Sequence, residues 1–87
     1  MTLEELRAQI DATDAQLVTL LAQRARLVSE AWRQKTEAQQ ELVDQTREEA
    51  VLALVDRLGE KLGLDSADVR RIWREILRVQ LRETPET

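Results

Sequence analysis

The first 35 residues carry one helical seam that no glycine or proline interrupts. Its residues follow the three-and-four spacing of one helical face: Leu3, Leu6, Ile10, Thr13, Leu17, Leu20, Leu27 and Ala31. We expect a helix that begins at Thr2, a favourable N-cap residue, and runs through Lys35 or slightly beyond. At ~1.5 Å per residue this helix is roughly 50 Å long. The rest of the chain is too short to cover it in a compact fold.

The apolar face of such a helix needs a surface to pack against. The chain has 87 residues, and a single domain of this size buries only roughly 60–65% of the surface that its unfolded chain exposes. We therefore expect residues 1–87 to form one domain, with much of the long helix packed against a second copy in a homodimer.

Two shorter helices are expected after the first one. The segment 36–43 is rich in Gln and Glu and has weak periodicity, so we expect a loop or a frayed link there, with Asp44 as the next N-cap. Gly63 is expected to end the second helix in a left-handed conformation. Asp65 or Ser66 then opens the third helix.

The inner faces of these two helices follow from their apolar periodicity. The expected inner residues are Val51, Leu54 or Val55, Leu58 and Leu62 in the second helix, and Val69, Ile72, Trp73, Ile76 and Leu77 in the third. Pro85 is expected to end the regular structure. With only two Gly, one Pro and no strand-like alternation, the predicted fold class is all-α.

Composition limits the chemistry. The chain has no Cys and no His, which excludes a disulfide framework, a thiol nucleophile, an imidazole base and the usual zinc sites; we expect no cofactor. Seventeen acidic and thirteen basic side chains give a net charge of −4, which disfavours nucleic acid and anionic membranes as partners. No long apolar run or leader is visible near Met1, so we expect a soluble cytoplasmic protein.

Arg24 occupies the seam position between Leu20 and Leu27, where an apolar residue is expected. A buried guanidinium without an anionic partner costs several kcal/mol. We therefore expect a counter-anion or an anionic ligand at this position. The alternative is an arginine that extends to solvent or pairs with a nearby glutamate.

Polar side chains on the other helices share the inward direction of Arg24. Lys35 lies eleven residues later, which is three turns plus about 20°, Arg47 continues the stripe of the second helix, and Gln80 continues that of the third. Thr84 lies one turn after Gln80. Each residue alone is compatible with an ordinary solvated surface position. Their common direction on three helices predicts a polar pocket.

Arg7 lies seventeen residues before Arg24, roughly 25 Å along one straight helix, so the two cannot grip one small ligand from the same chain. In an antiparallel dimer, Arg7 of one chain can approach Arg24 and Lys35 of the other, which would create a shared site. The alternative for Arg7 is a pair with Asp11, worth a few tenths of a kcal/mol.

The combined pattern resembles the all-helical, AroQ-class chorismate mutases over nearly the whole chain. The matching residues are Leu6-Arg7, Ile10, Asp14, Leu17, Leu20-Leu21, Arg24, Leu27, Lys35, Val43-Asp44, Arg47-Glu48, Gly59 and Leu64-Asp65. Each part is weak, but the spaced Arg, Lys and Asp-x-x-Arg-Glu set is specific in combination.

The resemblance implies an intertwined homodimer of three-helix subunits, one helix long and two shorter, with two equivalent shared sites. It also implies conversion of chorismate to prephenate in aromatic amino-acid (Phe/Tyr) biosynthesis. Arg24 and the other subunit's Arg7 would hold the two substrate carboxylates, while Lys35 would donate to the ether oxygen. This unimolecular rearrangement needs no nucleophile and no metal, which suits a chain without Cys and His.

The resemblance also assigns supporting roles and shows one departure. Arg47 would assist carboxylate binding, and Asp44 and Glu48 would address the substrate hydroxyl and the nearby backbone or lysine. Family members usually place a glutamine or glutamate near the end of the third helix as a second donor to the ether oxygen, but this chain has Thr84 there. Gln80, one turn earlier, is the candidate to replace that donor.

Other functions fit the same residues. Isochorismate pyruvate lyase shares the fold and most of the cationic set, and relatives that act on aminodeoxychorismate are also compatible. A non-catalytic helical dimerisation module is the alternative from another class. Association with a partner enzyme of the same pathway is left open.

Overall fold

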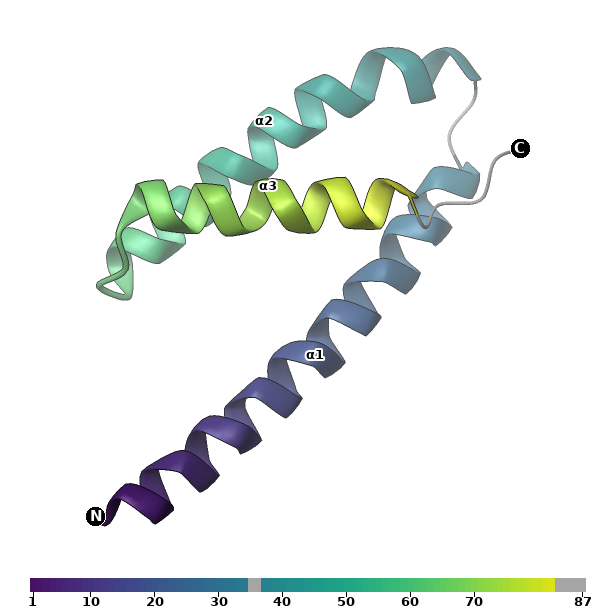
Figure 1. The fold of residues 1–87 in the computed structure, drawn as a ribbon. Coiled ribbons are helices and arrows are strands. Elements are labelled where there is room, and N and C mark those ends of the chain that lie inside the picture. Colours follow the sequence, from purple (N-terminus) through teal and green to yellow (C-terminus); the bar gives the residue numbers. More distant parts are fainter. Residues whose placement is uncertain (35–36, 83–87) are drawn as a thin grey trace.

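The structure, a computed structural model, describes the backbone of residues 1–34 and 37–82 and the side chains of residues 1–34 and 46–80. It contains three helices in the order α1 (Leu3–Gln34), α2 (Glu37–Lys61) and α3 (Ser66–Arg82). No strand occurs among these residues, which confirms the predicted all-α class. As Figure 1 shows, α2 and α3 lie side by side and antiparallel, whereas the N-terminal half of α1 stands away from both.

The start of α1 is fixed by a reciprocal pair of side-chain contacts. The backbone N–H of Glu5 donates to Thr2 Oγ1 over 3.1 Å, and the Thr2 hydroxyl donates to Glu5 Oε1 over 3.0 Å. This arrangement satisfies a backbone donor that has no partner inside the helix. It confirms Thr2 as the N-cap.

The turn between α2 and α3 also matches the sequence-based expectation. Gly63 has a φ of +81°, a conformation in which a Cβ is disfavoured. The N–H of Leu64 reaches back to the carbonyl of Gly59 over 2.8 Å, which closes the end of α2. Asp65 then accepts a hydrogen bond from the N–H of Asp68 over 3.1 Å, and so caps α3.

The prediction of a loop at residues 36–43 is wrong for the residues of this segment that the structure describes. Residues 37–43 are helical, because α2 begins at Glu37. Asp44 consequently lies inside α2 and is not its N-cap. Ala, Gln, Glu and Leu all favour helix, so the weak periodicity of this segment shows that it lacks a continuous apolar face, not that it lacks a helix. Thr36 and Pro85 lie outside the described residues.

The hydrophobic core lies between α2 and α3. Val51 and Val55 of α2 and Val69 of α3 are buried, and Trp73 and Leu77 pack against them. All five were expected on inner faces. Their burial removes apolar area from water, which is the main favourable contribution to packing these two helices.

Three of the expected inner residues are not covered. Leu58 and Ile72 are 47% and 56% exposed, and Leu62 is exposed as well, so the expectation is wrong for these residues within one chain. Of the two alternatives Leu54 and Val55, Val55 is the buried one. Ile76 is half-buried. Periodicity identifies an apolar face but does not tell whether the same chain covers it.

Two contacts bring α2 and α3 close together. Gly59 faces Val69 so closely that a Cβ on Gly59 would lie 2.9 Å from Val69 Cγ2. Nearby, Arg70 Nε donates to Asp56 Oδ2 over 3.0 Å and forms an ion pair between the helices. The other carboxylate oxygen, Asp56 Oδ1, is buried and lacks a hydrogen-bond partner among the described residues.

Helix α1 has no buried residue. Its exposed apolar residues are Leu3, Leu6, Ile10, Leu17, Val18, Leu20, Leu21 and Leu27. The single chain measures 54 × 24 × 15 Å and has a radius of gyration of 15.9 Å, whereas a compact domain of this length has about 12 Å. The described part of the chain contains no helix long and apolar enough to cross a membrane.

Candidate active site

Gln80 joins α3 to α1 through both polar atoms of its side chain. Arg24 Nη1 donates to Gln80 Oε1, and Gln80 Nε2 donates to the carbonyl oxygen of Leu21 over 3.0 Å. A guanidinium can only donate and a carbonyl can only accept, so the two partners fix which way the carboxamide faces. Gln80 is only 6% exposed, and its inward direction is confirmed.

Arg24 lies at the edge of this contact in a half-buried position. Partial burial lowers the pKa of its guanidinium, and the positive charge of Arg47 on α2 lowers that pKa further. The structure therefore joins Arg24 of α1 to Gln80 of α3, and Arg47 of α2 is near enough to act on Arg24 electrostatically. The predicted inward direction is confirmed for Gln80 and holds in part for half-buried Arg24, but it is wrong for Arg47, whose side chain is exposed within one chain.

The remaining predicted site residues fall into three groups. Glu48 follows Arg47 on α2 and is half-buried. Arg7 is exposed near the start of α1, seventeen residues before Arg24 on the same helix, so this chain does not bring it to the cluster. Lys35, Thr84 and the side chain of Asp44 lie outside the described residues.

The carbonyl of Leu21 is a part of the site that sequence reasoning missed. This carbonyl oxygen lies within helix α1, and the carboxamide of Gln80 donates to its second acceptor position. No sequence signal marks such a backbone acceptor, because every helical residue carries one. Its effect is to fix the carboxamide that contacts Arg24.

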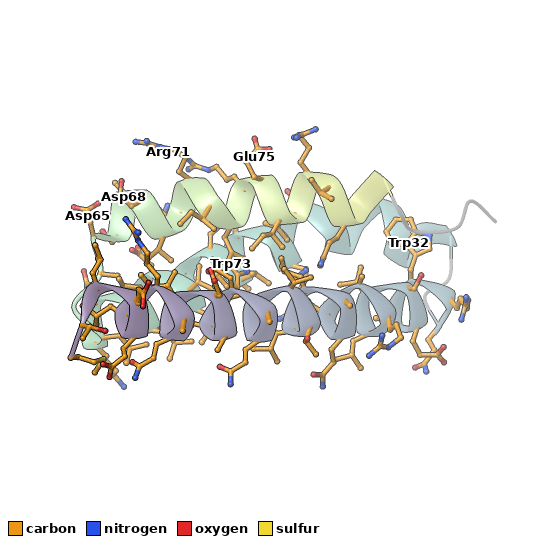
Figure 2. The ribbon with its side chains drawn as sticks, turned by 60° about the horizontal axis from the view of Figure 1, so that its bottom comes forward. Trp32, Asp65, Asp68, Arg71, Trp73 and Glu75 are labelled. Carbon is orange, nitrogen blue, oxygen red and sulfur yellow. The ribbon has the colours of Figure 1, made fainter. Side chains whose placement is uncertain are left out.

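A groove that shares Leu21 and Gln80 with this contact runs between α1 and α3. It has a volume of about 490 Å³ and is mostly apolar. The lining residues are Val18, Leu21, Ala22, Ala25, Glu75, Ile76, Val79 and Gln80. In Figure 2, Arg71 points away from the other two helices. The groove lies on another side of α3, because its lining residues come from α1 and α3.

The chemistry available here is that of anion binding. Arg24 and Arg47 supply positive charge, and the partner described for Arg24 is a neutral carboxamide that leaves this charge in place. Among the described side chains, no group of three or more His, Cys, Asp or Glu could hold a metal ion. Fixed donors of this kind bind carboxylates and stabilise negative charge that develops during a reaction. The described residues thus form an all-helical protein in which a half-buried arginine contacts a neutral carboxamide at the junction of α1 and α3.

The sequence profile of one family, chorismate mutase type II, matches residues 6–83. The chain belongs to this family, whose members are isomerases with chorismate mutase activity. This confirms the resemblance drawn from the spaced cationic residues. Neither the curated proteins nor the solved structures contain a significant match to the chain.

Proposed function

We propose that the chain rearranges chorismate to prephenate in two equivalent sites, each shared by two interlocked copies. The observation that carries this proposal is the contact of half-buried Arg24 with Gln80, because the described partner of this cation is a neutral side chain. A cation kept without a neutralising carboxylate at a helix junction costs stability. A dianionic substrate is the ligand that best offsets this cost.

The reaction is an intramolecular Claisen rearrangement, so the site has two tasks. It selects the compact conformer of chorismate, and it stabilises negative charge on the ether oxygen as the bond breaks. In our proposal, Arg24 and Arg7 of the partner subunit each hold one carboxylate. Lys35 donates to the ether oxygen, and this donor acts mainly in the transition state.

The other residues support these contacts. Arg47 assists carboxylate binding from α2, and Asp44 and Glu48 bind the substrate hydroxyl and position Lys35. Thr84 and Gln80 line the α3 side of the site. These roles extend the family resemblance to the positions of this chain, and the proximity of Arg24 to Arg47 supports them.

The surface of the single chain supports the homodimer. Its accessible surface is 7161 Å², whereas a compact monomer of 10.1 kDa exposes about 5,300 Å². The excess, about 1,900 Å² per chain, falls in the range of the interfaces that permanent dimers bury. A second copy packed on α1 would cover its exposed leucines and bring the partner's Arg7 to Arg24.

The experiment that tests this function is a direct product assay. Purified protein is given chorismate or isochorismate, and the products are separated and identified by NMR. We expect prephenate from chorismate without release of pyruvate. Pyruvate formed from isochorismate would favour the lyase. If neither substrate is converted and a bicyclic mimic of the transition state does not bind, the non-catalytic dimerisation module is the better description.

A further inference from the structure

We infer that Gln80 is a positioning residue, which acts on the reaction by holding the guanidinium of Arg24 rather than by donating to the ether oxygen of the substrate. This inference rests on the proposed function and is an alternative to the sequence-based idea that Gln80 replaces the donor missing at Thr84. It follows from how the polar atoms of the carboxamide are used, from the burial of Gln80 and from the charges around Arg24.

The carboxamide is already engaged on both sides. Its oxygen accepts from Arg24 Nη1, and its nitrogen donates to the carbonyl of Leu21. Nε2 keeps a second N–H, but swinging the carboxamide to aim it at a ligand would strain both contacts, because the oxygen and the nitrogen move together as one rigid plane. Gln80 is also buried, and a buried polar group that loses its partner costs ~1–3 kcal/mol.

The contact does more for Arg24 than fill space. An arginine side chain carries roughly 2 kcal/mol of rotamer entropy, which a ligand must remove if the side chain is free before binding. Here Gln80, itself fixed by Leu21, holds Nη1 in place in the ligand-free chain. The remaining N–H groups of the guanidinium stay available to a carboxylate.

The neutrality of Gln80 is as important as its position. Arg24 and Arg47 repel each other, and this repulsion contributes to the lowered pKa of Arg24. A glutamate at position 80 would relieve the repulsion but would also neutralise the charge that attracts the substrate. An amide oxygen binds the guanidinium and leaves its charge intact, which is the combination that an anion site needs.

A double-mutant cycle tests the inference. We expect Gln80→Met to lower kcat/KM for chorismate by about 10- to 100-fold, the effect of one hydrogen bond to a charged group, and mainly through KM. In an Arg24→Met background the same change is expected to alter kcat/KM less than about twofold, because Gln80 then has nothing to position. An equal loss of kcat in both backgrounds would overturn the inference, since it would mean that Gln80 meets the substrate directly.

A second measurement does not depend on turnover. In the ligand-free protein, slow rotation of the Arg24 guanidinium, read from its Nη resonances by ¹⁵N NMR, is expected in the wild type and lost in Gln80→Met. Gln80→Glu keeps the size of the side chain and its acceptor oxygen, so this variant replaces Gln80→Met in the test if Gln80→Met does not fold. In Gln80→Glu, slow rotation of the Arg24 guanidinium is expected to remain while KM for chorismate rises. Gln23→Met makes the same chemical change at an exposed position of α1 and is expected to behave as wild type.

The two readouts separate this inference from the proposed function. If the wild type converts neither substrate but slow rotation of the Arg24 guanidinium is lost in Gln80→Met, the proposed function is wrong. The contact by which Gln80 holds Arg24 is then still supported. If the wild type is active and the Arg24 guanidinium rotates freely with Gln80 present, the positioning role is wrong while the function stands.

Discussion

Gly59 of α2 lies directly against the side chain of Val69 of α3. A Cβ on Gly59 would lie 2.9 Å from Val69 Cγ2, a separation that real Cβ atoms essentially never show. Valine is stiff at χ1 in a helix, so its methyl group cannot turn aside without cost. The absence of a side chain at Gly59 is therefore a packing requirement of this helix pair.

We predict that Gly59→Ala destabilises the protein despite the better helix propensity of alanine. The propensity gain is about 1 kcal/mol, whereas overpacking costs about 1–3 kcal/mol. The expected net loss in the free energy of unfolding is up to about 2 kcal/mol, measured by urea titration. An increase in that free energy would contradict the close approach.

Gly63→Ala is the matched control, because no atom lies within 4 Å of the added Cβ. Its cost arises from backbone strain instead, since φ is +81°. A left-handed conformation costs a non-glycine residue about 1–2 kcal/mol. The truncation Val69→Ala should relieve the clash at Gly59→Ala but leave the cost of Gly63→Ala unchanged, which separates the two causes.

The exposed seam of α1 predicts how self-association can be broken. We expect Leu17→Glu to shift the protein from dimer to monomer in sedimentation equilibrium and to lower its melting temperature, because a charge then lies in the apolar face. Thr19→Glu is the control, since Thr19 is exposed on the opposite side of α1 and its hydroxyl donates to the carbonyl of Ala15 in the same helix. A wild-type melting temperature that does not rise with protein concentration would contradict the dimer.

Mixing two inactive variants tests whether the sites are shared. Arg7→Ala and Arg24→Ala are each expected to be nearly inactive. If each site takes Arg7 from one chain and Arg24 from the other, a heterodimer has one site with both residues intact. After subunit exchange at equal concentrations, we expect recovery of about one quarter of wild-type kcat per chain. If both arginines came from the same chain, the mixture would recover nothing.

Lys35→Ala tests the proposed donor to the ether oxygen. Loss of one donor that acts on developing charge commonly lowers kcat by about 10²- to 10³-fold. We expect a loss of this size with the dimer intact by sedimentation, because Lys35 is assigned to the substrate and not to packing. Turnover near the wild-type rate would refute the assignment. Arg33→Ala, which removes an exposed cation on the last turn of α1, is the matched control.

Features set by local chemistry could be predicted from the sequence. The cap at Thr2, the left-handed turn at Gly63 and the cap at Asp65 each depend on a few neighbouring residues, and all were expected. The start of α2 was not, because residues 37–43 combine good helix propensity with weak periodicity. Reading an absent apolar face as an absent helix produced that error.

Features set by distant contacts could be predicted only in part. Helical phase showed that Gln80 faces inward but not that it meets Arg24, which lies 56 residues away in the sequence. The exposure of Leu58 and Ile72 shows a related limit. Periodicity reports that a face is apolar, and only the assembled structure tells which chain covers it.

The free-standing first half of α1 links catalysis to the amount of protein in the cell. If the partner's Arg7 completes each site, a single chain has no complete active site. Well below the dissociation constant of the dimer, the rate of product formation then scales with the square of the chain concentration. A modest fall in synthesis would then reduce flux through the reaction more than proportionally. Dilution of the purified enzyme below its dissociation constant should show the same steep loss.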